Sequence, residues 1–345
     1  MKRYGHLYEQ VYDLVNLQVA YSNAKRGKGN YKQVRVFEPI AEEKLLELQQ
    51  LLKERRFCNG PYRIFRLMER GKQRTIYALP FYPDRILHHA VVQVLAPIWI
   101  KSFIRDTYAS IPGRGIHDAV DRVKTAVRQC DGWYGLKGDI RQFYPSVDHA
   151  VLKAVLRAKI KDPDMLVLLD EIIDSAPGIP IGNYLSQYFG NVVLSPLDHF
   201  IKEQLRIPHY FRYCDDFVLL HPDKKHLHWC RQAIAAFLKA YKLELKSNWQ
   251  VFPVSVRGVD FAGYISWPTH TQVRRKNIQR FKYRLKVKRM RLSEAQRLIH
   301  VTGSFKGWLR YADTKHLRRC RVLSVRSRAN QYLIGLNRKL LAEPL

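Results

Sequence analysis

Cysteine is scarce in this sequence, and the few cysteines present follow no disulfide pattern. The 345 residues include five, widely spaced and without a Cys-x-x-Cys pair. An odd number of isolated cysteines does not build a disulfide framework and suits a reducing compartment. The cluster His226-x-His228-x-Cys230 has the residue types of a zinc site, but no second ligand pair follows at finger-like spacing. We therefore expect free thiols and no structural zinc.

Long apolar runs are absent as well. The most apolar stretch, Ala90–Ile100, is too short to cross a bilayer and contains Gln93 and Pro97. The N-terminus lacks the apolar segment of a signal peptide. From these absences we expect a soluble protein of the cytoplasm that has no part in a membrane.

Acidic residues are few relative to basic ones. Asp and Glu number 30 against 60 Lys and Arg, which gives a formal net charge of +30. The excess is concentrated in the last fifth of the chain, where Thr271–Leu345 holds 21 basic and 3 acidic residues. Such a balance predicts a polyanionic partner, with nucleic acid first and an anionic membrane surface second.

The spacing of apolar residues predicts a mixed α+β fold without internal repeats or low-complexity linkers. Helical spacing recurs along the chain, and short apolar runs between turn residues predict strands. The predicted helices are Leu7–Ala20, a segment opened by Pro39, Ile86–Ile100, a segment from His117, Tyr184–Leu205, and a basic helical region beyond Gln272. The predicted strands are Tyr62–Met68, Arg74–Leu79, Trp133–Ile140, Leu243–Lys246, Phe261–Ile265 and the two runs that flank the acidic pair.

That acidic pair is Asp215 and Asp216, between the apolar runs Phe211–Cys214 and Phe217–Leu220. Apolar runs on both sides of a two-residue break predict a β-hairpin. Adjacent carboxylates repel each other, but a bound Mg²⁺ offsets this, because Mg²⁺ prefers oxygen ligands such as carboxylates and substrate phosphates. Taken alone, an ordinary surface turn explains the pair equally well.

A third carboxylate, Asp139, ends the predicted strand Trp133–Ile140. Two metal ions about 4 Å apart activate an attacking hydroxyl and stabilise a leaving oxygen, and carboxylates from separate strands hold such ions. The three aspartates have the chemistry for this kind of site. The alternative is that Asp139 merely caps its strand.

Six sequence blocks resemble those of reverse transcriptases, and they occur in the same chain order. A single block of this kind is weak, whereas six in order are specific. They are Asp84–His89 and Pro112–Ala119 (the first two blocks of the bacterial enzymes), Asp139–Tyr144 (motif A), Gly182–Gln187 (motif B), Tyr213–Asp216 (motif C) and Phe261–Tyr264 (the primer grip, with Ala262 for the usual leucine).

The resemblance implies a right-hand polymerase architecture within the α+β class. It divides the chain into an N-terminal helical extension (1–50), fingers and palm (51–268) and a basic helical thumb (269–345). An antiparallel palm sheet is expected to carry the acidic site. The implied activity is RNA-directed DNA polymerisation with two Mg²⁺ ions, for which Mn²⁺ is an expected substitute. The implied partners are template RNA, the cDNA or primer, and deoxynucleoside triphosphates.

The family's site residues carry over to matching positions. Metal binding and catalysis fall to Asp139, Asp215 and Asp216, with one more oxygen from the backbone carbonyl of Ile140. The nucleotide-binding residues implied are Lys72 and Arg74 at the triphosphate, Tyr144 as the aromatic gate against a ribose 2′-hydroxyl, and Ile181, Gly182 and Gln187 of motif B. The template and primer residues implied are Arg114, Phe261, Gly263 and Lys246, the last near motif D, where a lysine protonates the leaving pyrophosphate.

Simpler interpretations remain for some of these residues. Tyr144 has the alternative of a core aromatic, and Lys72 that of a solvated charge. The aromatic residues of the basic C-terminal region either stack on bases or, as helical spacing favours, pack in a core. They are Phe281, Tyr283, Phe305, Trp308 and Tyr311.

Motif B narrows the subfamily. Group II intron and retroviral enzymes typically have Gln-Gly-x-x-x-Ser-Pro, whereas this chain has Ile181 before the glycine and Gln187 after the serine. That pattern resembles reverse transcriptases of diversity-generating retroelements, which copy a template-repeat RNA with errors at adenines for mutagenic retrohoming into a target gene. A small basic accessory protein that forms an oligomeric ring is then an expected partner. The alternatives are an ordinary-fidelity retroelement enzyme of group II intron or retron type, and an inactive RNA-binding scaffold.

Overall fold

The computed structural model describes residues 2–69, 71–286, 291–317 and 322–342. These residues form two compact units, each assembled from separated segments of the chain. The first comprises Met1–Ile111, Gly138–Arg206 and Cys230–Trp249, and the second Pro112–Lys137, Ile207–Trp229 and Gln250–Leu345. In the described part of the chain, no helix is long and apolar enough to cross a membrane.

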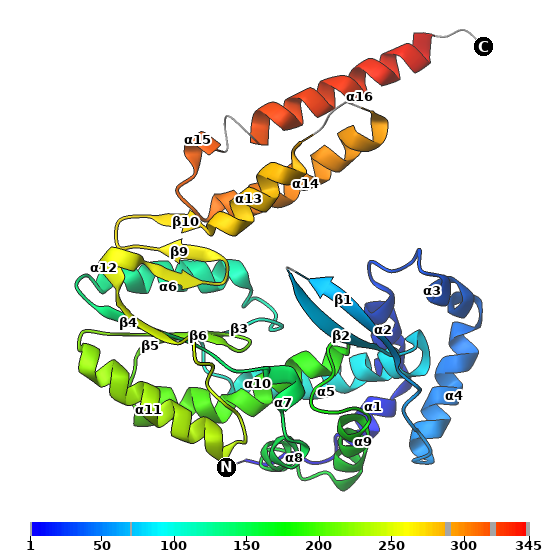
Figure 1. Cartoon of the computed structure of the whole chain (residues 1–345). Helices are drawn as coiled ribbons and strands as arrows, with labels where there is room; N and C mark the ends of the chain where they lie inside the picture. The colour runs from blue at the N-terminus through cyan, green and yellow to red at the C-terminus, as the bar shows by residue number, and fades with distance from the viewer. Residues whose placement is uncertain (1, 70, 287–290, 318–321, 343–345) are drawn as a thin grey trace. The chain divides into compact units, whose positions relative to one another are not determined.

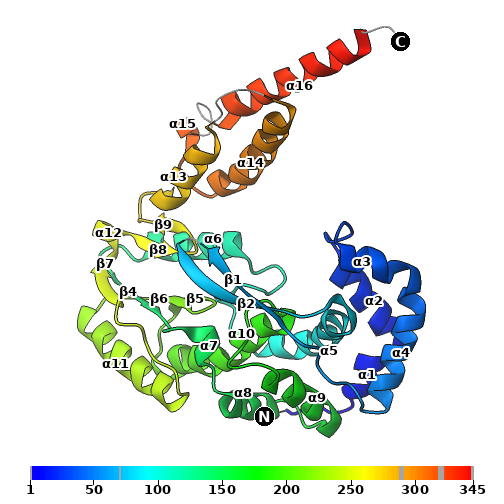
Figure 2. The ribbon, with the colours of Figure 1, turned by 45° about the vertical axis from the view of Figure 1, so that its right-hand side comes forward.

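The N-terminal part of the first unit is a group of packed helices (Figure 2). Asp13 interrupts the predicted helix Leu7–Ala20, because its side chain accepts a hydrogen bond from the Asn16 backbone and starts a new helix. One face of the fourth helix buries Leu45, Leu48 and Leu52. The helices are α1 (Tyr8–Tyr12), α2 (Leu14–Lys25), α3 (Lys32–Phe37), the 3₁₀ turn η1 (Glu38–Ile40), α4 (Ala41–Lys53) and α5 (Ile86–Ser102), which follows the π-turn η2 (Phe81–Arg85).

A two-stranded antiparallel hairpin joins α4 to α5. It consists of β1 (Arg63–Glu69) and β2 (Lys72–Ala78), paired from Arg63 with Ala78 to Glu69 with Lys72. Every side chain of β1 is exposed, whereas Ile76, Tyr77 and Ala78 of β2 are half-buried. The predicted strands Tyr62–Met68 and Arg74–Leu79 are therefore confirmed as the two strands of this hairpin.

The remaining helices of the first unit surround α10. Two of them begin with an aspartate cap: Asp148 accepts from the Val151 amide and Asp162 from the Met165 amide. The elements are β3 (Thr107–Tyr108), α7 (Phe143–Ser146), α8 (His149–Arg157), α9 (Pro163–Asp174), α10 (Tyr184–His199), the π-turn η3 (Phe200–Gln204), and α11 (Lys224–Ala240), which begins in the second unit.

An antiparallel sheet forms the centre of the second unit (Figure 1). Strands β5 (His209–Tyr213), β6 (Asp216–His221), β4 (Tyr134–Asp139) and β7 (Gln250–Pro253) lie in the order β5-β6-β4-β7. Strand β4 passes from the second unit into the first at Gly138. The middle of β6 is fully buried, which indicates that both faces of this sheet are covered.

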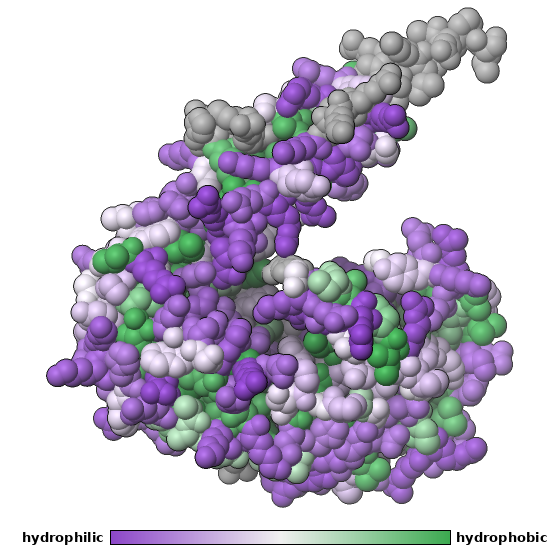
Figure 3. Space-filling view, viewed as in Figure 1, coloured by the Kyte–Doolittle hydropathy of each residue, from purple (hydrophilic) through white to green (hydrophobic). Residues whose placement is uncertain are grey.

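Smaller elements complete the second unit. Helix α6 (Ile116–Gln129) packs against β5 and against a three-stranded sheet of β8 (Val259–Phe261), β9 (Tyr264–Ser266) and β10 (Thr271–Val273). Helices α13 (Arg275–Arg284), α14 (Leu292–Arg310) and α16 (Ser324–Ala342) follow, with the short α12 (Val254–Arg257) and α15 (Lys315–Leu317). Figure 3 shows a mostly hydrophilic surface over α13 and α14, as their many basic residues require.

The α+β prediction is confirmed, but two strand predictions need correction, and further strands were missed. Phe261–Ile265 is not one strand: Ala262 and Gly263, both with positive φ, form the turn between β8 and β9. In Leu243–Lys246 only Leu245 forms a bridge, with Ile140. Strands β7 and β10 were not predicted, because neither has a strong apolar alternation.

The C-terminal helical prediction is confirmed for α13, α14 and α16. Its parts at 287–290, 318–321 and 343–345 lie outside the described residues. The proposed boundaries of extension, fingers with palm, and thumb stay a prediction.

Candidate active site

The acidic turn joins the two central strands of the second unit. Tyr213 pairs with Asp216, so Cys214 and Asp215 form a two-residue loop, and Cys214 has a positive φ of 55°. That conformation is uncommon outside glycine. The fully buried Arg212 donates a hydrogen bond of 2.8 Å to the Cys214 carbonyl and so holds the loop from below.

A lysine on β4 reaches the same turn. The Lys137 ammonium lies 3.5 Å from Oδ2 of Asp216 and donates a hydrogen bond of 2.6 Å to the Asp260 carbonyl. Both members of the Lys137–Asp216 pair have about a quarter of their side chain exposed. An ion pair of this exposure contributes little to stability, but it fixes where the Asp216 carboxylate lies.

Asp139 ends β4 within the first unit. Its carbonyl accepts a hydrogen bond of 2.9 Å from the Lys246 amide, and its Oδ1 lies 4.0 Å from the Lys246 ammonium. Arg141 donates from its amide to the Glu244 carbonyl, so Ile140 opposite Leu245 makes no ladder hydrogen bond on this side. The Ile140 carbonyl is therefore directed away from Leu245.

The three carboxylates are divided between the units, with Asp139 in the first and Asp215 and Asp216 in the second. Asp139 follows Lys137 by two residues in β4, so both side chains leave the strand on one face. Within the described ranges, no three His, Cys, Asp or Glu side chains gather as a metal-binding group. In donor chemistry, carboxylate oxygens and a backbone carbonyl fit Mg²⁺.

Tyr144 lies in the short helix α7, one residue after the buried Phe143. The turn begins at Gln142, which has a positive φ of 44°. Beneath it, Gly190 of α10 leaves room for the two rings: a Cβ there would lie 3.1 Å from Phe143 and 3.9 Å from Tyr144. Tyr144 is half-exposed, so it is not a fully buried core aromatic.

The motif B loop is docked on the hairpin of the same unit. The Tyr77 amide donates a hydrogen bond of 2.8 Å to the Ile181 carbonyl. Gly182 has a φ of +122°, and a Cβ at this position would lie 2.5 Å from the Tyr77 carbonyl oxygen. Only glycine fits both the backbone angle and the contact.

Gln187, one turn into α10, contacts an unusual backbone segment. Its Oε1 accepts a hydrogen bond of 2.8 Å from the Ser110 hydroxyl. Ala109 and Ser110 both have positive φ, 78° and 57°, and Asn191 donates 3.1 Å to the Ala109 carbonyl. Two hydrogen bonds from α10 thus hold a strained pair of residues.

The cationic residues of the hairpin are exposed. Arg74 is paired with Glu69 at 3.0 Å across the hairpin, and both side chains are more than two-fifths exposed. Lys72 pairs with Glu69 in the strand register and is also exposed. Arg74 is therefore engaged by Glu69 in this structure.

Three of the four template-side candidates belong to the second unit, and Lys246 does not. Arg114 lies between Gly113 and Gly115 in the loop before α6, and Phe261 and Gly263 flank the β8–β9 turn. Gly263 lies under Trp308, whose indole ring is close to the position of a Cβ. Lys246 belongs to the first unit, beside Asp139.

The C-terminal aromatic residues are mainly structural, as their spacing predicts. Phe281 and Phe305 are buried in one cluster and stack on each other. Trp308 stacks on Tyr264, and the Tyr264 hydroxyl donates 2.9 Å to the Trp308 carbonyl. Tyr283 is 74% exposed and is the exception.

The block Asp84–His89 lies at the start of α5 and is largely buried. Asp84 accepts a hydrogen bond of 2.8 Å from the Gly60 amide, and burial raises the pKa of its carboxyl. Burial lowers the pKa of His88 to about 3 and that of His89 to about 4. Both imidazoles are therefore neutral at ordinary pH, and this block builds the interior of its unit.

Three contacts beside the candidate residues were missed by sequence reasoning: Lys137 with Asp216, Arg212 with the Cys214 carbonyl, and Ser110 with Gln187. A cation alternating with apolar residues in a strand is a weak signal for the first two. Nothing in the local pattern marks Ser110, since its partner is 77 positions away.

This chain is similar to one protein family and to several known proteins. The family model for reverse transcriptase (RNA-dependent DNA polymerase) matches residues 63–266. Protein YkfC of Escherichia coli is 26% identical over 156 residues, 41% of either chain. The group II intron-encoded protein LtrA of Lactococcus lactis is 26% identical over 178 residues, 48% of this chain and 29% of LtrA. The chain thus matches less than half the length of these curated relatives.

Among solved structures, two telomerases of Candida tropicalis share the fold at 13% identity. The apo telomerase aligns over 81% of this chain and 59% of its own, with a TM-score of 0.54. A telomerase in complex with a TWJ fragment of telomeric RNA aligns over 89% of this chain and 59% of its own, with a TM-score of 0.52. The predicted α+β polymerase fold is confirmed by this likeness. Because the family model covers more than half of the residues, the chain belongs to the reverse transcriptase (RNA-dependent DNA polymerase) family.

Proposed function

We propose that this chain is an RNA-directed DNA polymerase whose metal ligands are Asp139, Asp215 and Asp216. The observation that carries the proposal is the pair of carboxylate-bearing strand ends, β4 and the β5–β6 turn, within the region matched to reverse transcriptases. When bound there, Mg²⁺ ions lower the pKa of an attacking hydroxyl and stabilise the leaving pyrophosphate. The Ile140 carbonyl offers a further oxygen.

The chain's own residues have four further roles in this proposal. Arg74 pairs its planar guanidinium with the triphosphate after it leaves Glu69. Tyr144 excludes a ribose 2′-hydroxyl by its bulk, and Lys246 holds a proton for the leaving pyrophosphate. Arg114 and the basic C-terminal helices contact template and primer phosphates, which position nucleic acid without reading its sequence.

A primer-extension assay on an RNA template tests the polymerase proposal. Asp139→Asn and Asp215→Asn each lower incorporation at least about 10³-fold, because metal clamps supply several kcal/mol of transition-state stabilisation. The control is Asp131→Asn, since Asp131 is an exposed aspartate of the loop before β4. Undiminished incorporation by Asp139→Asn contradicts the assignment of the site. No incorporation by the unaltered protein with Mg²⁺ or Mn²⁺ favours an inactive RNA-binding scaffold.

We further propose the subtype, a diversity-generating retroelement enzyme that makes errors at template adenines. The support is Ile181 in place of a hydrogen-bonding glutamine, together with Gln187 after the serine. A polar side chain lost beside the base pair relaxes discrimination, since a site that makes hydrogen bonds rejects analogues that leave them unmade. The product is a mutated cDNA for target-gene diversification, and the expected partner is a small basic accessory protein.

Sequencing the cDNA separates this subtype from an ordinary-fidelity retroelement enzyme. Errors concentrated at template adenines support it, and Ile181→Gln then reduces them. Errors spread evenly over the four template bases refute it and favour the group II intron-like alternative. An unchanged spectrum in Ile181→Gln leaves the subtype possible but refutes the role of Ile181.

A further inference from the structure

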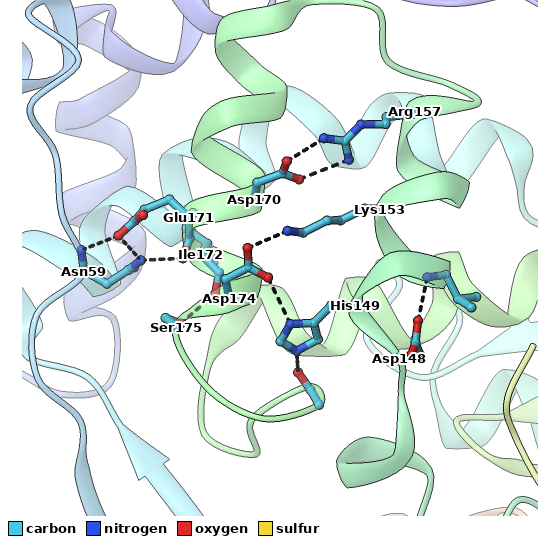
Figure 4. A network of polar contacts seen from close by, with 12 residues as sticks. Asn59, Asp148, His149, Lys153, Arg157, Asp170, Glu171, Ile172, Asp174 and Ser175 are labelled. Carbon is cyan, nitrogen blue, oxygen red and sulfur yellow. Dashed lines mark hydrogen bonds and ion pairs between the residues drawn. The ribbon is translucent and has the colours of Figure 1, made fainter.

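A polar network links α8, α9 and the loop that follows α9 (Figure 4). His149, the first residue of α8, lies with Nδ1 3.0 Å from Oδ1 of Asp174, the last residue of α9. Its Nε2 lies 3.0 Å from the carbonyl oxygen of Gly178. Lys153, one turn further along α8, donates to the other Asp174 oxygen.

Both ring nitrogens of His149 face hydrogen-bond acceptors. The Lys153 ammonium, and to a smaller degree His149, hold the pKa of Asp174 below its usual range, so this carboxylate is ionised and accepts only. The Gly178 carbonyl also accepts only. A neutral imidazole donates from one nitrogen, so the two bonds together require the doubly protonated ring.

The loop held in this way rests on the backbone of Tyr144. The Ile179 amide donates a hydrogen bond of 2.7 Å to the Tyr144 carbonyl. Gly178 has a φ of +60°, and a Cβ on it would lie 2.5 Å from the Tyr144 oxygen and 2.7 Å from that of Pro145. The loop and the Tyr144 turn are therefore packed backbone against backbone, and one cannot shift without the other.

The far end of the same loop is fixed to the hairpin. Ile181 accepts from the Tyr77 amide, as described above, and Asn183 donates 2.8 Å to the Tyr62 hydroxyl. That hydroxyl also shares a hydrogen bond of 2.8 Å with Ser175. Residues 175–183 thus form a strap whose middle, Gly178 and Ile179, rests on Tyr144 and whose ends, Ser175 and Asn183, both hydrogen-bond the Tyr62 hydroxyl just before the hairpin.

We propose that His149 and Asp174 are positioning residues, which fix the position of Tyr144 relative to the sugar of the incoming nucleotide. This inference rests on the proposed function, because the role of Tyr144 as the gate is part of that proposal. His149 itself is assigned no contact with the substrate. The His149 ring holds the Gly178 carbonyl beside α8, and the contact between Gly178 and Tyr144 transmits that position to the gate. Loss of the hydrogen bond between His149 and the Gly178 carbonyl lets the strap move away from Tyr144. The nucleotide is then bound less tightly, and deoxyribose is distinguished less well from ribose.

A second ion pair between the same two helices, α8 and α9, provides a matched control. Arg157 and Asp170 also link α8 to α9, through two hydrogen bonds between guanidinium and carboxylate, but neither touches the strap. A variant of Asp170 weakens the same helix pair without releasing Gly178. Any difference between the His149 and Asp170 variants therefore reports on the strap and not on the packing of α8 against α9.

The kinetic test compares His149→Ala, His149→Gln and Asp170→Ala in steady-state primer extension with dNTP and rNTP. We expect His149→Ala to raise the KM for dNTP roughly tenfold, which corresponds to about 1.4 kcal/mol, and to admit more rNTP, with a smaller effect on kcat. Asp170→Ala leaves KM and sugar discrimination unchanged. Equal effects of His149→Ala and Asp170→Ala overturn the proposal.

His149→Gln gives a second readout that a merely structural role does not move. The charged groups around His149 among the described residues are Asp174 of α9, Lys153 of α8, and the Asp148–Lys242 pair at the start of α8. The glutamine keeps one hydrogen-bond donor beside these groups, so we expect it to reverse part of the rise in KM caused by His149→Ala. A KM equal to that of His149→Ala refutes the proposal.

Hydrogen exchange separates failure of this proposal from failure of the proposed function. The Ile179 amide is protected by Tyr144, so His149→Ala accelerates its exchange and Asp170→Ala does not, whether or not the protein polymerises. Unchanged exchange in His149→Ala overturns the positioning role by itself. An inactive unaltered protein whose Ile179 exchange follows this pattern overturns only the function. Thermal unfolding of all three variants verifies that they are folded.

Discussion

Replacing Gly182 by alanine tests the motif B loop most directly. In the folded chain this residue has a φ of +122°, and an added Cβ would lie 2.5 Å from the Tyr77 carbonyl oxygen and 3.2 Å from Ile76. Neither neighbour yields easily, because the closest atom belongs to the backbone of β2. The loop must therefore move away from the hairpin or remain strained.

The magnitude follows from two parts. A left-handed conformation costs an L-residue roughly 1–2 kcal/mol. Displacing the loop also breaks the Tyr77–Ile181 hydrogen bond of 2.8 Å, worth about 0.5–1.5 kcal/mol. Together, Gly182→Ala is expected to destabilise the docked loop by about 1.5–3.5 kcal/mol, which is roughly a tenfold to several-hundredfold loss of nucleotide affinity if the loop forms part of that site.

The assay is the KM for dNTP in primer extension, with thermal unfolding measured in parallel. Gly27→Ala is the matched control, since Gly27 also has a positive φ of +70° but no atom within 4 Å of its added Cβ. Gly27→Ala therefore introduces only the conformational strain, and we expect it to leave the KM for dNTP unchanged. If Gly182→Ala and Gly27→Ala change the KM equally, or if neither does, the loop does not contribute to nucleotide binding.

Three further outcomes follow from particular contacts. Glu69→Gln frees Arg74 and lowers the KM for dNTP, whereas a higher KM would show that Glu69 assists the substrate. Ser110→Ala removes the bond to Gln187 and, by loosening the strained segment, lowers thermal stability by about 1 kcal/mol; an unchanged melting temperature contradicts this. Burial lowers the pKa of His88 from its ordinary value of 6.5 to about 3. Its contribution to stability is therefore fully present above about pH 6.5 and is lost as pH falls from there towards 3, so His88→Leu resists acid unfolding better than the unaltered protein, as circular dichroism would measure.

Elements defined by local alternation were predictable from the sequence. The β1–β2 and β5–β6 hairpins each have apolar or mixed runs around a short break, and both form as hairpins. The β5–β6 turn lies one residue earlier than predicted, at Cys214 and Asp215, because Asp216 pairs with Tyr213. The β8–β9 turn was missed although Gly263 signalled it, because an apolar run from Phe261 suggested continuity. The local pattern of apolar residues decides how such elements are predicted from sequence. A single glycine is a weak turn signal when apolar residues surround it.

The environment of the candidate residues was not predictable in the same way. The partners of Gln187, Ile181 and His149 stand 77, 104 and 25 or more positions away along the chain. Their meeting depends on how α8, α9 and α10 pack around the strap. The residue types in the motifs were therefore enough to predict Tyr144 and the three aspartates as candidates. The contacts that hold Tyr144 in place could be seen only in the folded structure.

The fixed backbone of Ile181 makes its side chain a clean probe of fidelity. Its carbonyl is engaged by Tyr77, and the neighbouring Gly182 fits closely against the same strand. Ile181→Gln therefore changes the chemistry presented by the loop without moving the loop. Gln187 is different, because its side chain holds Ser110, and any substitution there also releases a strained backbone. A change in error spectrum caused by Ile181→Gln is attributable to the side chain alone. A change caused by a Gln187 substitution must be compared with that of Ser110→Ala as a control. If Ser110→Ala alone reproduces the Gln187 effect, the position of the Ala109–Ser110 segment, and not the amide of Gln187, governs fidelity there.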